Sequence, residues 1–225
     1  LPGDVRLELE AFPPPVLAHV AAAVLLLEDD PAMAQQYAAV AKRMAGRNAA
    51  VRETLGMCAY QAGDFETALR EFKAAGRISG RDDLVPLIAD CERALGRPER
   101  ALEIASAPVT LNQADRVELR LVAAGARMDL GQPGAAARML RGPLLGSDEV
   151  GSMSARIKYV YASALLADHR ADEAREWFLR AAQADVDGET DAAEQAMALD
   201  APSDEESSDG EGSSAASSQR REEQR

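Results

Sequence analysis

The stretch 49–76, AAVRETLGMCAYQAGDFETALREFKAAG, limits most strongly what this chain can fold into. Apolar residues recur at spacings of three and four in its first half, which predicts one face of a helix, and they do so again in its second half. Gly63-Asp64 breaks the pattern between the two halves. The predicted apolar faces contain Leu55, Cys58, Ala59 and Ala62 before the break, and Ala68, Leu69, Phe72 and Ala75 after it. A hairpin of two helices cannot cover both apolar faces by itself, so further helices must pack against it.

The turn of this hairpin recurs along the chain. Glycine stands again at Gly96 and Gly131, 33 and 35 residues further on each time, and proline follows two residues after each. A small residue lies five positions after each turn glycine, at Ala68, Ala101 and Ala136. A last copy spans 155–185, where His169 takes the place of the glycine, 38 residues after the previous turn. The longer spacing predicts a short insertion at 146–152.

An irregular first hairpin is predicted over residues 15–43. Asp29-Asp30-Pro31 would form its turn. Its first helix would be lined by Leu17, Val20, Val24 and Leu27. With this copy, the chain contains about five predicted hairpins.

The third and fourth hairpins depart from the pattern of the others. Ala105 and Leu140 stand where the second hairpin has its aromatic residue. Pro108 and Pro143 follow three residues later in each case. Because proline cannot continue a helix, we expect the second helices of these two hairpins to end early.

These hairpins resemble the tetratricopeptide repeat (TPR), a helix-turn-helix unit of about 34 residues. The residues that carry the resemblance are Leu55-Gly56 in the first helix, Gly63-Asp64-Phe65 in the turn, and Ala68, Phe72 and Ala75 in the second helix. Gly56 and Ala68 would let the helices approach, while Phe72 would fill the space toward the next hairpin. The resemblance covers roughly residues 15–184 and implies an all-α, right-handed superhelical solenoid of about five hairpins. The whole chain is also similar to TPR proteins of actinobacteria, a looser resemblance that names no activity.

The two ends of the chain differ from the hairpins. Residues 1–14 are rich in proline and are predicted to form an extended lead-in. The domain of helical repeats would span 15–199, and the capping-box spacing of Asp191 and Glu194 predicts a last short helix that covers its end. Residues 200–225 are rich in Ser, Glu, Asp and Gly and lack apolar periodicity, so we predict a disordered acidic tail. We interpret this tail as a solubilising extension; the alternative is that it mimics an acidic ligand or occupies a basic partner.

Charge and hydropathy argue against two classes of partner. The formal net charge is −13, of which residues 200–225 carry −5 and the rest −8, whereas nonspecific nucleic-acid binding needs a basic surface. The longest apolar run, 16–27, is too short to cross a bilayer. It also lacks the basic start and the small-residue cleavage site of a signal peptide. We therefore expect no nucleic-acid partner, no membrane partner and a cytoplasmic location.

No pattern in the sequence points to catalysis or to a cofactor. Cys58 and Cys91 lie 33 residues apart at equivalent points of two first helices, and we interpret them as small buried residues, with a disulfide or redox pair as the alternative. His19 and His169 lack metal-ligand spacing, and His169 is interpreted as an exposed turn residue. Paired carboxylates such as Asp82-Asp83 fall at turns or helix starts, where they favour the positive end of the helix dipole. We therefore expect no enzyme activity, no metal and no cofactor.

The TPR resemblance implies a groove along the first helices of successive hairpins, which receives a peptide or helix of a protein partner. The matching positions in this sequence are Glu53, Met57, Tyr60, Gln61, Pro86, Asp90, Arg93, Leu121, Gly125, Met128, Tyr159, Ser163 and Leu166. A family variant that holds a terminal carboxylate with Lys and Asn is disfavoured, because Glu53, Met57, Pro86 and Asp90 stand at those places.

The function predicted on this basis is a protein-interaction scaffold. Three alternatives stay open: a regulator that senses a small peptide or metabolite in the same groove, a structural subunit that self-associates through its end hairpins, and an enzyme of unknown type.

Overall fold

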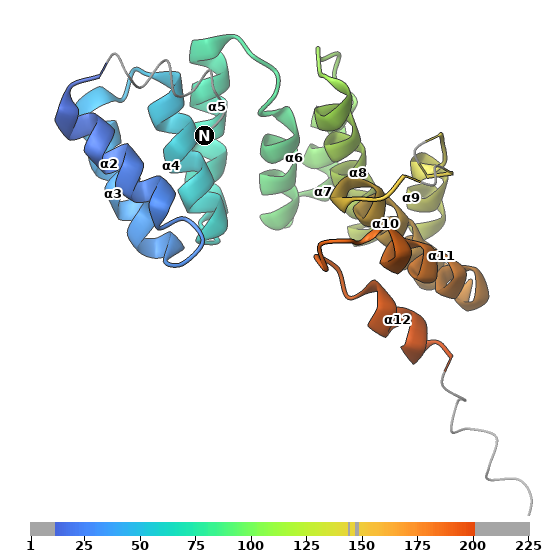
Figure 1. Cartoon of the computed structure of the whole chain (residues 1–225). Coiled ribbons are helices and arrows are strands. Elements are labelled where there is room, and N and C mark those ends of the chain that lie inside the picture. Colours follow the sequence, from blue (N-terminus) through green and yellow to red (C-terminus); the bar gives the residue numbers. More distant parts are fainter. Residues whose placement is uncertain (1–11, 144, 147–148, 201–225) are drawn as a thin grey trace, which may run out of the picture.

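A computed structural model describes residues 12–143, 145–146 and 149–200, and these residues form eleven helices and no strand (Figure 1). The predicted all-α class is confirmed. The helices are α2 (Pro14–Leu25), α3 (Pro31–Ala45), α4 (Ala49–Gln61), α5 (Phe65–Ser79), α6 (Val85–Ala94), α7 (Pro98–Ala105), α8 (Gln113–Asp129), α9 (Pro133–Leu140), α10 (Ser152–Ala167), α11 (Ala171–Ala184) and α12 (Ala192–Ala198). Most of the predicted lead-in and the acidic tail beyond Asp200 lie outside the described residues, as do three positions near the predicted insertion.

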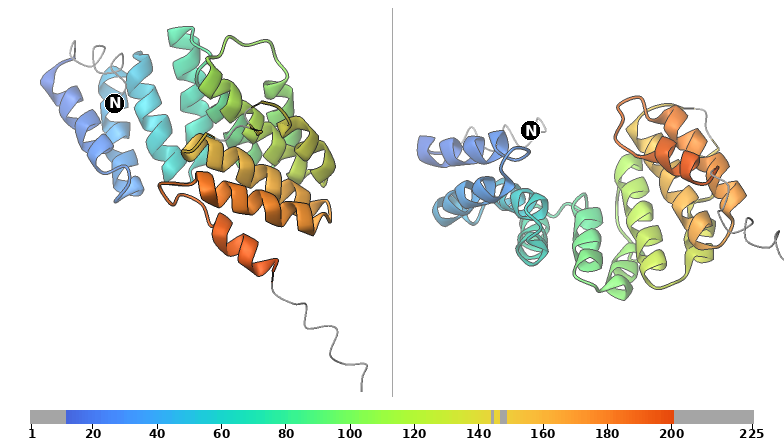
Figure 2. Two further views of the ribbon diagram at one scale, coloured as in Figure 1. Left: turned by 45° about the vertical axis from the view of Figure 1, so that its right-hand side comes forward. Right: turned by 90° about the horizontal axis from the view of Figure 1, so that it is seen from below.

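Each helix packs mainly against its neighbours along the chain. The pairs α2/α3, α4/α5, α6/α7, α8/α9 and α10/α11 form hairpins, and each second helix also contacts the first helix of the next pair. Among the first helices, α6 contacts α8, and α8 contacts α10. Figures 1 and 2 show the hairpins following one another in chain order from α2 to α12. Consequently the faces of the first helices, far apart in sequence, come side by side.

Four of the five predicted turns share one backbone geometry. Gly63, Gly96 and Gly131 have φ angles of 77°, 71° and 68°, and His169 has 59°. At the first of these turns, the amide of Gly63 donates to the carbonyl of Tyr60 at 3.1 Å, and the next amide donates to a carbonyl five residues back at 2.8 Å. The same two hydrogen bonds close the other three turns, as expected for a helix end with one left-handed residue. His169 is exposed, so its interpretation as a turn residue is confirmed.

The second hairpin shows why glycine stands at position 56. A Cβ atom placed on Gly56 would lie 2.6 Å from the ring of Phe72, which is fully buried. The missing side chain of Gly56 therefore makes room for the aromatic ring, and this close approach joins α4 to α5.

The second helices of the third and fourth hairpins are short, as predicted. Helices α7 and α9 have eight residues each, whereas α5 has 15 and α11 has 14. Each short helix ends three residues before its proline, Pro108 or Pro143. The residue before a proline is disfavoured in helical conformation, so the helix ends upstream of it.

Two details of the prediction are wrong. In α2 the buried residues are Val16, Val20 and Ala23, whereas Leu17 is 40% exposed, because the helix presents a face shifted by one residue from the predicted one. Leu27 lies beyond the end of this helix. Helix α12 forms and packs against α11, but no capping box holds its start.

The start of α12 is held in a different way. The Asp191 carboxylate accepts a hydrogen bond from Nε2 of Gln195 at 2.9 Å and another from the hydroxyl of Tyr159. It makes no capping hydrogen bond to the amides of the first turn of α12. Tyr159 belongs to α10, so this contact ties the last helix to the preceding hairpin.

The two cysteines are buried and form no disulfide with each other. Burial raises the pKa of the Cys58 thiol to about 11 and that of Cys91 to about 12. Their interpretation as small buried residues is confirmed. In the described part of the chain, no helix is both long and apolar enough to cross a membrane.

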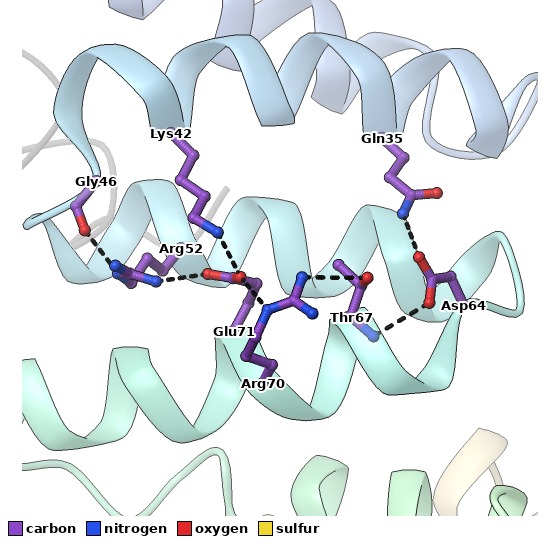
Figure 3. A network of polar contacts seen from close by, with 8 residues as sticks. All are labelled: Gln35, Lys42, Gly46, Arg52, Asp64, Thr67, Arg70 and Glu71. Atoms are coloured by element: carbon purple, nitrogen blue, oxygen red, sulfur yellow. Dashed lines mark hydrogen bonds and ion pairs between the residues drawn. The ribbon is translucent and has the colours of Figure 1, made fainter.

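A buried carboxylate joins the first two hairpins (Figure 3). Glu71 of α5 is fully buried and pairs with Lys42 of α3 at 2.6 Å, with Arg52 of α4 at 2.7 Å and with Arg70 at 3.0 Å. Burial alone would raise the pKa of Glu71, but the hydrogen bonds and charges of its three cationic partners outweigh burial and hold that pKa below its usual value. Glu92 occupies a similar position between the next two hairpins, where it pairs with Lys73 at 2.7 Å.

Candidate functional site

The main functional candidate is a groove across four helices. It is a cavity of about 540 Å³ whose walls come from α4, α6, α8 and α10, the first helices of four successive hairpins. We call it the A-groove. Its described lining consists of Tyr60, Asp83, Pro86, Leu87, Asp90, Arg93, Asp115, Glu118, Leu121, Val122, Gly125, Met128, Asp129, Arg156, Tyr159, Val160 and Ser163.

Nine of the thirteen residues predicted for the site come together in the A-groove. They are Tyr60, Pro86, Asp90, Arg93, Leu121, Gly125, Met128, Tyr159 and Ser163. Of the other four, three belong to α4 and Leu166 belongs to α10, and all four lie outside its lining. Glu53 is half-buried, Met57 packs against the apolar cluster around Phe72, and Gln61 is exposed at the end of the helix.

Polar contacts join each first helix to the next across the A-groove. The hydroxyl of Tyr60 on α4 donates to the carboxylate of Asp90 on α6. Arg93 of α6 pairs with the same Asp90 at 2.9 Å and reaches Asp129 of α8 at 3.3 Å. The guanidinium of Arg156 on α10 donates to both carboxylate oxygens of Glu118 on α8, with the Nη2–Oε2 distance at 2.8 Å.

Gly125 gives Arg93 the room for its contact with α8. A Cβ atom at Gly125 would lie 3.4 Å from Cδ and Nε of Arg93, so the arginine side chain passes directly over the backbone of α8. A methyl group at this position would touch the arginine stem at van der Waals distance, and a longer side chain would compete with it for space over α8. The small residue predicted for the groove therefore has a positioning role.

The two tyrosines of the A-groove stay protonated and act as hydrogen-bond donors. Burial raises the pKa of Tyr60 well above its usual value, and the hydrogen bond to Asp90 raises it further. Burial and the hydrogen bond to Asp191 raise the pKa of Tyr159 to about 12. The ring of Tyr60 also packs edge-on against Phe65 at 5.5 Å, so this side chain supports the wall as well as lining it.

The charge of the A-groove is negative. Its lining has five carboxylates against two guanidinium groups, and both arginines are already paired with carboxylates of the groove. One end gathers Asp83, Asp115 and Glu118. Burial and then the charge of Asp83 raise the pKa of Asp115, with Glu118 adding to the effect. A positive charge from outside would therefore be stabilised at this end.

Several lining residues were not predicted from the sequence. Asp115, Glu118, Val122 and Asp129 lie on the same face of α8 as the predicted Leu121 and Met128, and Arg156 and Val160 share the face of Tyr159 on α10. The signal that could have found them is the spacing of three and four residues, continued toward both ends of each first helix.

Among the described residues, no group of three or more His, Cys, Asp or Glu side chains is arranged to hold a metal ion. Comparison with protein-family models gives no match, and comparison with curated proteins gives none either.

Proposed function

We propose that this chain is a TPR-like solenoid of helical hairpins and that it acts as a protein-interaction module, with a peptide or helix of its partner bound in the A-groove. The observation that carries the proposal is the composition of this groove. Four successive first helices contribute to one cavity, and residues up to about 100 positions apart in sequence, from Tyr60 to Ser163, line it together. This is the arrangement that the repeat resemblance implies for a peptide-binding surface.

The chemistry of the A-groove selects the class of partner. Leu87, Val122, Met128 and Val160 offer apolar surface in the groove, while five carboxylates give it a negative charge. Apolar and aromatic anchors dominate the energy of such interfaces, and charge complementarity mainly sets specificity and association rate. The proposed partner is therefore a segment with apolar anchors and one or more Lys or Arg residues. A segment that ends in an acidic cluster would be repelled.

The test is a selection of peptides from a random library on the full-length protein. The matched pair of variants is Asp115→Lys, which reverses one charge of the A-groove, and Asp172→Lys, which reverses an exposed charge in the first turn of α11. Both substitutions place a cation in the first turn of a helix, so they share the unfavourable interaction with the helix dipole, and Asp115→Lys also loses the hydrogen bond from Asn112. Selected peptides should be enriched in Lys or Arg together with apolar residues, and should bind Asp115→Lys less tightly than Asp172→Lys.

The proposal fails if the selected peptides are acidic, or if they bind both variants as tightly as the wild type. Peptides that pass identify a sequence pattern, and crosslinking in the source cell then tests whether a protein carrying that pattern is captured by the wild type and lost from Asp115→Lys. Tyr60→Ala is a poor variant for this purpose, because the Tyr60 ring packs against Phe65 and its loss would damage the wall itself.

A second candidate function follows from the size of the A-groove. A volume of about 540 Å³ lies within the range of roughly 300–1,000 Å³ that is usual for small-molecule sites. The candidate is a regulator that binds a short peptide or a metabolite there. Saturable binding of one small molecule per chain, abolished by Val122→Trp, which fills the cavity, would favour this candidate over the interaction module.

Self-association is a third candidate, and the exposed apolar residues of the first hairpin favour it. Leu25 is 79% exposed and Met44 is 50% exposed, on α2 and α3 respectively. Light scattering of the purified chain over a range of concentrations tests it. A monomer at all concentrations would exclude a structural subunit built on this end.

A further inference from the structure

A second cavity lies on the other side of α8 and has the opposite charge. It has a volume of about 370 Å³ and is lined by Arg116, Arg120 and Arg127 together with apolar residues of α7, α9 and the connection between α7 and α8. Its described lining contains no carboxylate. We call it the arginine pocket.

The arginine pocket exists because α7 is short. Residues after Ala105 leave the helical path ahead of Pro108, and the connection then passes along α8, where Pro108, Val109 and Leu111 form one wall. The arginines follow the spacing of one helix face, and this face differs from the one that lines the A-groove. Helix α8 thus separates an acidic cavity from a basic one.

Within the described residues, none of the three guanidinium groups has a carboxylate oxygen within 4.0 Å, although other arginines of the chain form many such pairs. Their hydrogen bonds go to uncharged acceptors instead. Arg116 donates to the carbonyl of Leu111 at 2.8 Å, and Arg127 donates to Oε1 of Gln132 at 2.6 Å.

Hydrogen bonds to backbone carbonyls fix the third arginine, Arg120, at the end of α9. It donates to the carbonyls of Met139 and Arg141. A guanidinium has five N–H donors, so each of these groups keeps donors for another acceptor. In addition, Nε of Arg127 is buried and has no hydrogen-bond partner in the described part of the chain. The apolar wall lowers the local dielectric constant, which strengthens any ionic contact made here.

We propose that the arginine pocket binds the acidic segment 204–211 of this chain, DEESSDGE. The segment has five carboxylates in eight residues and no cation. The A-groove repels such a segment, whereas the arginine pocket offers three charges of the opposite sign with donors to spare. Charge-assisted hydrogen bonds between guanidinium and carboxylate are among the strongest polar contacts in proteins.

The proposed occupant is the segment of the same molecule or of a second copy, and it follows closely on the last described residue. Asp200 is held at α11 by an ion pair with Arg175 at 2.9 Å, and residue 211 is eleven positions further on. An extended chain of that length spans up to about 40 Å. The occupant is the same in both cases, and the proposal does not depend on what binds in the A-groove.

The test uses the full chain with Asp204, Glu205, Glu206, Asp209 and Glu211 changed to their amides, so that its own segment no longer competes. A fluorescent peptide of residues 201–212 is titrated into this protein, and fluorescence anisotropy reports binding. We expect saturable binding that weakens as salt is added, since exposed charges are screened within about 10 Å at 0.1 M. A peptide with the same five residues as amides should not bind.

The pocket is identified with Arg116→Gln and Arg127→Gln, while Arg138→Gln on α9, exposed and outside the pocket, is the control. Arg120 is left unchanged because it holds the end of α9. Each pocket substitution should weaken binding about tenfold, as expected for the loss of one charge-assisted contact, and the control should not change it. Equal binding by the pocket variants and the control, binding of the uncharged peptide, or no binding at all would overturn the proposal.

Arginine side-chain NMR of the unmodified full-length chain gives an independent reading. The Nε–H signal of Arg127 should move when the five acidic residues are changed to amides, because a carboxylate then leaves its neighbourhood. A signal at the same position in both proteins would contradict the proposal even if the added peptide binds.

Discussion

Replacing Glu71 by glutamine should lower the free energy of unfolding strongly, although the substitution hardly changes the volume of the side chain. Glu71→Gln keeps the shape of the side chain but removes the negative charge among Lys42, Arg52 and Arg70. An ion pair at about 4 Å contributes about 4 kcal/mol at an effective dielectric constant of 20, before the desolvation cost of the buried carboxylate is subtracted.

The solvent exposure of the three cationic partners indicates how much free energy of unfolding Glu71→Gln should lose. Removing one member of a buried ion pair costs about 3–5 kcal/mol. Here the side chains of Lys42, Arg52 and Arg70 are 30%, 23% and 61% exposed, so they regain water when their partner is lost. We therefore expect the lower end, about 3 kcal/mol in the free energy of unfolding. For a chain of this length that corresponds to a melting temperature lower by roughly 6–12 °C.

The assay is urea unfolding followed by circular dichroism, with Glu103→Gln as the control. Glu103 is 65% exposed and pairs with Arg100 on the surface, so its substitution should cost less than about 0.5 kcal/mol. The argument for a buried ionic junction would be refuted if the two variants lost the same stability.

The pH dependence of unfolding supplies a second measurement for the same residue. The folded-state pKa of Glu71 lies below its ordinary value of 4.5, so its contribution is complete above that pH and is lost as the pH falls through the folded pKa. The wild type should therefore lose stability below about pH 4.5 more steeply than Glu71→Gln. Parallel pH profiles would contradict the assignment of the shift to this group.

Three further outcomes follow from the packing and the turns. Gly56→Ala should lower the free energy of unfolding by about 1–3 kcal/mol, because its Cβ would lie 2.6 Å from an aromatic ring. Gly76→Ala should raise the free energy of unfolding by about 0.5–1 kcal/mol, because the nearest atom to its Cβ would be 3.6 Å away. Urea titrations that rank the two variants in the opposite order would contradict the close approach of α4 and α5. His169→Gly should raise stability by roughly 0.5–1 kcal/mol in the same assay because the residue has a φ of 59°, and a loss would show that the imidazole stabilises the turn. Cys58 and Cys91 should react with a thiol reagent at pH 8 only after unfolding, since both are buried with raised pKa values, and fast labelling of the native protein would disprove their burial.

The helices and turns could be predicted from the sequence because their signals are local. The spacing of Leu55, Cys58 and Ala59 determines one face of a helix, and a turn glycine recurs at nearly regular intervals. The wrong face at Leu17 has a local reason as well, since the first hairpin lacks the glycine turn that sets the register elsewhere. The burial of Glu71 could not be predicted, because Lys42 and Arg52, the two partners that lie across from it, belong to two other helices.

For the A-groove, the sequence allowed us to predict only those positions that the TPR resemblance assigns to the first helices. Tyr60, Asp90 and Tyr159 were named because equivalent helix positions face the same way. The bridge between Glu118 and Arg156 was not, since it depends on the distance between two helices that only the folded chain defines. The charge of the groove likewise became visible only when the carboxylates of α6, of α8 and of the turn before α6 were placed together.

Separate apolar clusters, rather than one common core, have a mechanical consequence. The buried apolar residues of the described chain fall into five clusters, and each helix touches little beyond its neighbours in sequence. Small rotations of each hairpin against the next therefore accumulate from one end of the described chain to the other. The A-groove spans the junctions from the second hairpin to the fifth, so a substitution at one of these junctions, such as the one around Glu92, can change how far apart the groove walls stand.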